Sequence, residues 1–217
     1  MEGRKIFDYC FIALGLLVQV VTYCLMPHDT WLSLLSGCLG VCSVCLASQG
    51  NIWTFAFGFG QVITYTYLCW TQRFYGEIAI NAYYFGTMVY GVFVWKSRVN
   101  SRESRVIVPR KLRWQTMVLI GAATLVLSGL TGWGLATWTD DTQPYLDAFT
   151  TIPALVAQVL MILVYREHWF FWLAIDVLSV ALWLRAGDYC MVAQYVFWCA
   201  NCLYGLHRWR SLGISKE

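Results

Sequence analysis

The feature that most constrains this chain is a series of long apolar segments, each close to the ~20 residues with which a helix crosses a bilayer. Short polar or turn-forming breaks separate them. Hydrophobic residues make up 59% of the chain and charged residues only 12%, whereas soluble domains carry about 25% charged residues. A water-soluble fold of this size could not bury so much apolar surface, so the sequence predicts an all-α polytopic membrane protein. Eight transmembrane helices are expected, at Ile6–Met26, Trp31–Ala47, Ile52–Trp70, Glu77–Trp95, Trp114–Trp138, Tyr145–Tyr165, His168–Ala186 and Tyr189–Trp209.

The Lys and Arg residues indicate how these helices are oriented. If the N-terminus is cytoplasmic, 13 of the 15 basic residues fall on the cytoplasmic side and only Arg73 and Arg185 fall on the other. Loops that face the cytoplasm carry the excess of Lys and Arg. The sequence therefore predicts a multi-pass membrane protein with both termini in the cytoplasm. Because the basic residues are spread over short loops, no nucleic-acid partner is expected.

An internal repeat relates two groups of three segments. Tyr90-Gly91-x-x-x-Trp95 closes the fourth segment, and Tyr204-Gly205-x-x-x-Trp209 closes the eighth, 114 positions later. Asn51-Ile-Trp53 and Glu167-His-Trp169 open the third and seventh segments, 116 positions apart. Both groups begin outside and end inside, so they are expected to be parallel repeats about an axis along the membrane normal, the SWEET-like arrangement.

This repeat predicts a 1 + 3 + 1 + 3 organisation in four parts. An additional N-terminal transmembrane helix precedes the first repeat, and a basic cytoplasmic loop with a linker helix joins the two repeats. The second repeat ends in a cytoplasmic tail. The corresponding ranges are 1–29, 30–97, 98–143 and 144–217.

The seventh segment carries the clearest candidate site. Trp169, Trp172 and Asp176 recur at helical spacing and share one face with Ser179 and Trp183. A carboxylate inside the bilayer costs at least about 2.5–3.5 kcal/mol, and no Lys or Arg lies in the core of any segment. Asp176 could contact a ligand, or it could be a protonated or hydrogen-bonded structural group. The two tryptophans could stack on an aromatic ligand or belong to the interfacial belt.

Further polar and aromatic side chains are expected to face the same interior. Each amide has a second interpretation, because buried amides in membrane helices often bond only to another helix. That two related units present such faces favours a ligand site between them. These additional candidate binding residues are Gln61, Asn81, Tyr84, Met88, Gln158, Gln194, Tyr195, Trp198 and Asn201.

Several kinds of chemistry are not expected. Nine cysteines include two CxxC spacings, Cys42/Cys45 and Cys199/Cys202. Metal or redox chemistry is one interpretation, but packing inside apolar helices is favoured because no ligand set is completed nearby in the sequence. There is no phosphate-binding glycine loop and no nucleophile–base motif. The sequence predicts no cofactor, no bound metal and no catalytic residue, so the protein is not expected to be an enzyme.

From about Ser36 to Trp209 the chain resembles the PnuC family of vitamin transporters. Glu167-x-Trp169-x-x-Trp172-x-x-x-Asp176-x-x-Ser179 contains the most specific part of this resemblance, the Trp-x-x-Trp pair. The remaining motifs are Tyr75-Gly-Glu, Asn81-x-Tyr-Tyr84, Tyr90-Gly91-x-x-x-Trp95 and Tyr145-Leu-Asp147-Ala.

The resemblance implies uptake of nicotinamide riboside by facilitated diffusion, with trapping of the vitamin by a cytoplasmic kinase. It also implies a 3 + 1 + 3 bundle and a homotrimer in the lipid bilayer of the bacterial inner membrane. Met88 departs from the pattern, because nicotinamide riboside carriers often have Gln or Asn there. Thiamine is the main alternative substrate, since it too is a flat aromatic cation, and riboflavin is a third. A membrane sensor or subunit that binds a ligand without moving it is the alternative class.

Overall fold

The computed structural model of the protein describes residues 2–25, 30–72, 75–99, 106–140, 143–186 and 189–214. Within these ranges the chain forms eight α-helices, and its only β-pairing consists of isolated bridges. The eight predicted segments correspond one to one with these helices, so the all-α prediction is confirmed. The helices are α1 (Glu2–Leu25), α2 (Trp31–Ser48), α3 (Thr54–Gln72), α4 (Tyr75–Arg98), α5 (Trp114–Trp138), α6 (Pro144–Ile162), α7 (His168–Ala186) and α8 (Tyr189–Ile214).

The helix ends follow from local sequence. Thr30 caps α2, since its hydroxyl accepts a hydrogen bond from the Ser33 N–H at 3.2 Å. Pro144 begins α6 at the position where a missing N–H costs nothing. Helices α4 and α8 continue past their predicted ends to Arg98 and Ile214, because polar residues continue a helix after the apolar segment stops.

Five helices in the described ranges are long and apolar enough to cross a membrane: α1, α2, α4, α5 and α6. In α4 the qualifying stretch is Ile78–Arg98. Helix α7 has a shorter apolar stretch, His168–Ala181. Helices α3 and α8 carry polar residues along their lengths. Large apolar side chains such as Leu119 and Val126 are exposed on the outer surface of the bundle, as expected of a surface that faces lipid.

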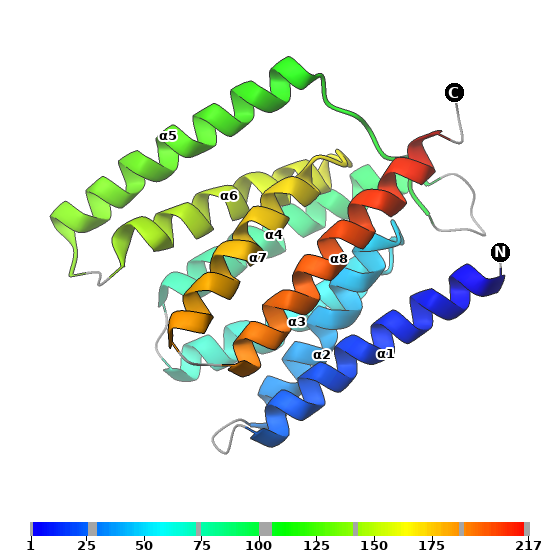
Figure 1. The fold of residues 1–217 in the computed structure, drawn as a ribbon, viewed down its shortest axis with the longest axis horizontal. Helices are drawn as coiled ribbons and strands as arrows, with labels where there is room; N and C mark the ends of the chain where they lie inside the picture. Colours follow the sequence, from blue (N-terminus) through cyan, green and yellow to red (C-terminus); the bar gives the residue numbers. More distant parts are fainter. Residues whose placement is uncertain are drawn as a thin grey trace.

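The helices pack in two similar groups. In the first unit, defined here as α2–α4, α2 packs on α3 and α3 on α4. In the second unit, defined as α6–α8, α6 packs on α7 and α7 on α8. The units meet where α2 packs on α8 and α4 on α6. Helix α1 lies along one edge of the bundle against α2 and α8, and α5 lies along the opposite edge against α6 (Figure 1).

The α2–α3 and α6–α7 turns have the same backbone hydrogen bonds, 114 positions apart. The Gly50 N–H donates to the Ala47 carbonyl at 2.9 Å, and the Val164 N–H donates to the Met161 carbonyl at 3.0 Å. Gly50 and Val164 both have positive φ, 69° and 65°. A β-branched residue rarely adopts this conformation, so the Val164 backbone is strained, and the fully buried side chain holds it in place.

The 116-residue offset predicted for the openings of α3 and α7 is wrong. The Asn51 N–H bonds to the Leu46 carbonyl as the Tyr165 N–H bonds to the Leu160 carbonyl, both at 2.9 Å. Asn51 therefore corresponds to Tyr165 rather than to Glu167. The triplets Asn51-Ile-Trp53 and Glu167-His-Trp169 have similar sequences but occupy different positions in the two turns. The backbone hydrogen bonds of the turns, and not the tryptophans, show which residues are equivalent.

Residues 106–113, which we call the strap, lie across both turns. The Ile107 N–H donates to the Gly50 carbonyl at 3.0 Å, and the Arg110 N–H donates to the Val164 carbonyl at 2.7 Å. These carbonyls belong to corresponding residues of the two units. Glu167 is buried and accepts a hydrogen bond from the Leu112 N–H at 3.1 Å. The strap thus connects the two units at this end of the bundle.

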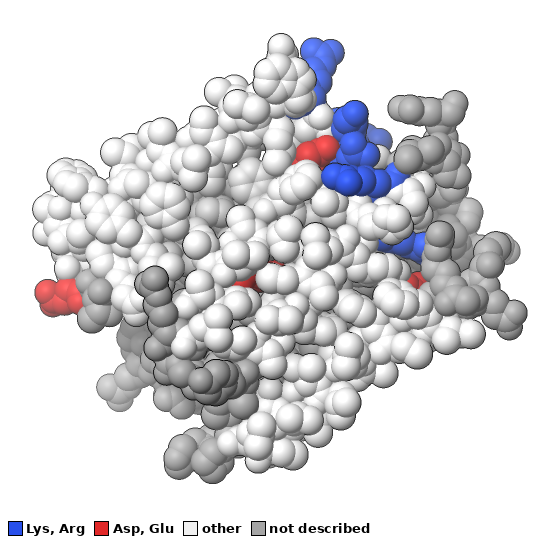
Figure 2. Space-filling model, viewed as in Figure 1, with Lys and Arg blue, Asp and Glu red and all other residues white. Residues whose placement is uncertain are grey.

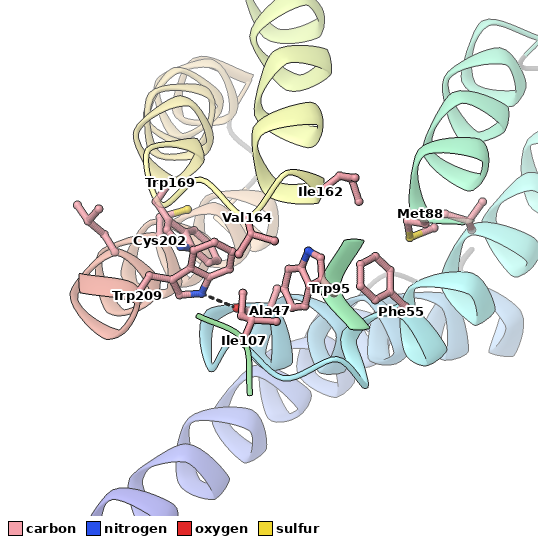
Figure 3. Close-up of a cluster of buried hydrophobic side chains, with 12 residues drawn as sticks. Ala47, Phe55, Met88, Trp95, Ile107, Ile162, Val164, Trp169, Cys202 and Trp209 are labelled. Carbon is pink, nitrogen blue, oxygen red and sulfur yellow. Dashed lines mark hydrogen bonds between the residues drawn. The ribbon is translucent and has the colours of Figure 1, made fainter. Parts of the chain in front are cut away.

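Trp95 and Trp209 fill the core beside the strap, and neither is exposed to solvent (Figure 3). Their rings meet edge to face, with centroids 5.7 Å apart. The Trp95 indole N–H donates to the Met161 carbonyl at 3.2 Å, and the Trp209 indole N–H donates to the Ala47 carbonyl at 2.9 Å. Each bond crosses from one unit to the other.

Close packing around α8 gives a stability prediction. A Cβ at Gly205 would lie 2.5 Å from the Trp169 ring, inside van der Waals contact. We expect Gly205→Ala to lower the stability by about 1–3 kcal/mol, the usual cost of overpacking. Thermal unfolding in detergent measures this effect. Gly86→Ala is the matched control, because a Cβ there meets no heavy atom within 4 Å. Equal melting temperatures for the two variants would contradict the packing argument.

Candidate functional site

A cavity of about 360 Å³ lies between the two units. Both units contribute to its wall, whereas the described residues of α1 and α5 do not. Such a volume suits a small organic molecule. The described lining residues are Ser43, Val44, Ala47, Thr54, Phe55, Gly58, Gln61, Val62, Tyr84, Met88, Gln158, Met161, Trp169, Trp172, Ile175, Asp176, Tyr195, Trp198 and Cys202.

The structure brings nine of the twelve candidate residues together around this cavity. They come from α3, α4, α6, α7 and α8, which are distant in the sequence. The nine are Gln61, Tyr84, Met88, Gln158, Trp169, Trp172, Asp176, Tyr195 and Trp198.

Asp176 is the only acidic residue among the described lining residues. It is 7% exposed, and its Oδ2 atom accepts a hydrogen bond from the Cys202 thiol at 3.3 Å. A thiol is a weak donor. In the part of the chain that the structure describes, the only ion pair joins Arg166 to Glu167. Asp176 is therefore a buried carboxyl group without a basic partner among those residues.

Aromatic rings line the cavity mainly on the side of the second unit. Trp172, Tyr195 and Trp198 are partly buried, so part of each ring remains open to the cavity. Trp169 is 3% exposed, which excludes the interfacial-belt interpretation for this residue. By contrast, Trp53 is 48% exposed and does not line the cavity.

The two glutamines of the cavity differ in their partners. The Gln158 side-chain amide donates to the Thr87 hydroxyl at 3.2 Å, which links α6 to α4. The Gln61 side chain also lines the cavity, and it has no hydrogen-bond partner among the described residues. Gln61 is therefore the amide that is free to meet a ligand.

Three candidates lie outside the lining. Asn81 is 3% exposed within the bundle, and Gln194 is partly buried on α8. Asn201 is fully buried, and neither polar atom of its side chain has a partner among the described residues. The part of α8 that lines the cavity consists of Tyr195, Trp198 and Cys202.

Sequence reasoning missed ten lining residues, including Ser43, Thr54, Phe55, Gly58 and Cys202. An offset of 114 would have found several of them, because it pairs Phe55 with Trp169 and Gly58 with Trp172. Eight pairs of lining residues have this spacing. They are Val44/Gln158, Ala47/Met161, Phe55/Trp169, Gly58/Trp172, Gln61/Ile175, Val62/Asp176, Tyr84/Trp198 and Met88/Cys202.

This fold and cavity define a polytopic helical membrane protein with a cavity between two helical units, of a size that suits a small organic molecule. No group of three His, Cys, Asp or Glu side chains in the described ranges could hold a metal ion. The lining combines aromatic rings, a carboxylate and an amide, which suits a flat, polar, positively charged ligand.

Comparisons with known proteins agree with this class. The family model described as "Nicotinamide mononucleotide transporter" matches residues 30–211. The nicotinamide riboside transporter PnuC of Haemophilus influenzae is 33% identical, covering 98% of this chain and 93% of that protein. PnuC of Neisseria mucosa is 28% identical over 97% and 83%. The "Crystal structure of the Vitamin B3 transporter PnuC" superposes with a TM-score of 0.79 at 27% identity, covering 97% of this chain and 93% of that one.

The chain therefore belongs to the nicotinamide mononucleotide transporter family, whose PnuC members are similar to it over nearly its whole length. It is a multi-pass membrane protein, and the relatives named here are transporters. The predicted resemblance to the PnuC family is confirmed.

Proposed function

We propose that this protein takes up nicotinamide riboside across the bacterial inner membrane. The observation that carries the proposal is the position of Asp176, a buried carboxylate in an aromatic cavity. The chain is also 33% identical to a protein named as a nicotinamide riboside transporter. Nicotinamide riboside has a flat pyridinium ring with a positive charge, and the cavity offers one carboxylate and several rings to it.

The proposed mode of transport is facilitated diffusion. Among the described lining residues, Asp176 is the only ionisable carboxylate, which supports a carrier that binds its substrate without a dedicated coupling site. Net uptake then needs a sink, and phosphorylation of the vitamin by a cytoplasmic kinase supplies it, because the added phosphate is negatively charged and is repelled by a site that contains a carboxylate.

In this proposal each group of the cavity has a role. Trp172 and Trp198 stack on the ring, Trp169 closes the wall behind it, and Asp176 balances the positive charge. Amides and hydroxyls bond to the carboxamide and the ribose. The further proposed binding residues are Gln61, Asn81, Tyr84, Met88, Gln158, Gln194, Tyr195 and Asn201.

We further propose that the two units are parallel repeats that rock about the cavity in alternating access. The turn hydrogen bonds and the eight lining pairs at 114-residue spacing support this proposal. The equivalent packing of α2 on α8 and of α6 on α4 supports it too. In the resulting 1 + 3 + 1 + 3 scheme the parts are 1–29, 30–97, 98–143 and 144–217.

The proposed orientation places both termini in the cytoplasm. On the face in Figure 2 the basic side chains gather at one end of the molecule, and most of the remaining described surface is uncharged. This distribution supports the orientation by the excess of Lys and Arg on cytoplasmic segments. A homotrimer is the proposed assembly, with the exposed apolar edges of the bundle facing lipid or a second copy.

Thiamine is the second candidate substrate, and Met88 is the observation that favours it. Met88 lines the cavity, where an amide is expected in a carrier of nicotinamide riboside. A thioether cannot donate a hydrogen bond to a sugar hydroxyl, but it packs well against an aromatic ring. Thiamine is a flat cation without a sugar. Riboflavin is neutral and is the weaker alternative.

Uptake into liposomes containing the purified protein tests this proposal. We expect labelled nicotinamide riboside to equilibrate across the membrane and to exchange with unlabelled substrate on the far side. Ionophores should leave the rate unchanged, and an enclosed kinase with ATP should produce accumulation above equilibrium. Binding of the vitamin without transport would instead assign the protein to the class of sensors or subunits. Uptake of thiamine but not of nicotinamide riboside would identify thiamine as the substrate.

Trp172→Ala is expected to weaken nicotinamide riboside binding by about tenfold or more. Stacking of a heterocycle on an aromatic side chain is worth about 1–3 kcal/mol by alanine substitution, and part of the Trp172 ring is open to the cavity. Calorimetric titration of the purified protein measures the change in Kd. The matched control is Trp53→Ala, since Trp53 lies outside the cavity. Equal changes in Kd for the two variants would show that Trp172 does not contact the ligand.

A further inference from the structure

Ser43 on α2 and Thr54 on α3 form a reciprocal pair in the cavity wall. The Ser43 hydroxyl lies 2.9 Å from the Thr54 carbonyl, and the Thr54 hydroxyl lies 2.8 Å from the Ser43 carbonyl. The two hydroxyl oxygens are 3.2 Å apart. Both residues line the cavity, and Thr54 is 2% exposed. No motif in the sequence indicates this pair.

Two protons cannot serve all three of these contacts. Each hydroxyl has one proton, and the two shortest contacts lead to carbonyl oxygens, which can only accept. The protons therefore go to the Thr54 and Ser43 carbonyls. The two hydroxyl oxygens are left with lone pairs only, close together at the wall of the cavity. A hydrogen-bond donor placed between them would satisfy both oxygens.

The pair occurs in one unit only. The residues 114 positions later are Ala157 and His168. Ala157 has no polar side-chain atom, and His168 is fully buried with its Nδ1 atom 2.7 Å from the Tyr165 carbonyl. Neither lines the cavity. The hydroxyl pair thus makes the cavity polar on the side of the first unit, whereas the carboxylate and the tryptophans lie on the side of the second.

We propose that the Ser43–Thr54 hydroxyl pair is the acceptor site for a hydrogen-bond donor of the transported molecule, an –NH₂ or –OH group. This inference rests on the proposed function. With the cation held by the second unit, the donor group of the same molecule points to the first. Nicotinamide riboside offers the carboxamide –NH₂ and the ribose hydroxyls, and thiamine offers its ring –NH₂.

The Ser43–Thr54 hydroxyl pair would then select ligands that carry a hydrogen-bond donor at this position. An acceptor-only site rejects a group that is itself an acceptor, because the opposed lone pairs repel and lose their water. Nicotinic acid riboside carries a carboxylate in place of the carboxamide. If the carboxamide occupies the pair, wild-type protein binds nicotinamide riboside far more tightly than the acid. If a ribose hydroxyl occupies it, deoxygenation of that carbon gives the large loss instead.

Thr54→Val is the main test. Valine keeps the shape of threonine and removes the hydroxyl, and the Ser43 carbonyl remains bonded within helix α2. We expect the Kd for nicotinamide riboside to rise about tenfold, the size of one lost buried hydrogen bond. A ligand that lacks the donor group bound by the hydroxyl pair should have the same Kd for the wild-type protein and for Thr54→Val. Ser43→Ala should behave in the same way. Calorimetry with nicotinamide riboside, nicotinic acid riboside and 5′-deoxynicotinamide riboside measures the full cycle.

Thr64→Val is the control, because the Thr64 hydroxyl lies on the same helix and bonds only to the Gly60 and Gln61 carbonyls. If Thr54→Val lowers the melting temperature but leaves every Kd ratio unchanged, the pair only ties α2 to α3 and the inference is overturned. If wild-type protein binds thiamine and not nicotinamide riboside, the Kd values of wild type and Thr54→Val are compared for thiamine and for oxythiamine, which lacks the ring –NH₂. Failure of wild type to bind either vitamin overturns the proposed function and this inference together.

Discussion

We expect Asp176→Asn to raise the Kd for nicotinamide riboside on the order of 100-fold or more and to abolish uptake at micromolar substrate. Asparagine preserves the shape of the side chain and removes its charge. Breaking a buried pair of opposite charges costs about 3–5 kcal/mol, and each 1.4 kcal/mol is a factor of about ten in affinity. Asp176 is buried, and among the described residues its hydrogen-bond donor is the Cys202 thiol. Calorimetry and liposome uptake give the two readouts.

The same substitution should make the empty protein more stable. A charged carboxylate without a basic partner is costly to bury, and an amide at the same place is less so. We therefore expect Asp176→Asn to raise the melting temperature of the ligand-free protein and to lower its affinity for nicotinamide riboside. A carboxylate that served only the fold would lose stability on this change, so the pair of measurements separates a ligand contact from a structural role.

Glu167→Gln is the matched control for Asp176→Asn. Glu167 is equally buried, but Arg166 pairs with it at 3.3 Å and the Leu112 N–H donates to it. We expect this variant to lose stability and to keep its affinity for the vitamin. Unchanged affinity in Asp176→Asn would exclude a cationic substrate at this position and would favour a neutral one such as riboflavin.

The helices and much of the site could be predicted because both depend on local periodicity. Apolar length alone places all eight helices. Helical spacing then brings Trp169, Trp172 and Asp176 to one face, and all three line the cavity. A charged or aromatic residue inside an apolar segment stands out in a sequence, so the residues with the most distinctive chemistry were found first.

The remaining lining residues depend on information that a sequence does not display. Ser43 and Thr54 have common side chains whose role follows from the carbonyls that they contact across two helices. Asn201 satisfies the helical spacing but lies off the cavity, because the packing of α8 on α2 decides how α8 is rotated. The 114-residue spacing between the α2–α3 and α6–α7 turns could not be predicted, because Gly50 and Val164 share a backbone conformation but have different side chains.

The second large effect is expected from Trp209→Phe, which should open one end of the cavity. The Trp209 and Trp95 indoles hold the two units together, since each donates to a carbonyl of the opposite unit. Figure 3 shows the bond from Trp209 to Ala47. Any motion that separates the units beside the strap has to break both bonds. Phenylalanine keeps an aromatic ring but loses the N–H and part of the packing, at a cost of about 1–2 kcal/mol to the closed arrangement.

Cys202 reports this opening, because its thiol lines the cavity and is 4% exposed. We expect the rate of its modification by a membrane-impermeant thiol reagent to rise about tenfold in Trp209→Phe, and only when the reagent is added on the side of the strap. Mass spectrometry locates the label. Trp133→Phe is the control, since Trp133 is 54% exposed on α5. A lower melting temperature with unchanged labelling of Cys202 would mean that Trp209 serves packing alone, whereas faster labelling from that side identifies the indole pair as the contact that closes the carrier there.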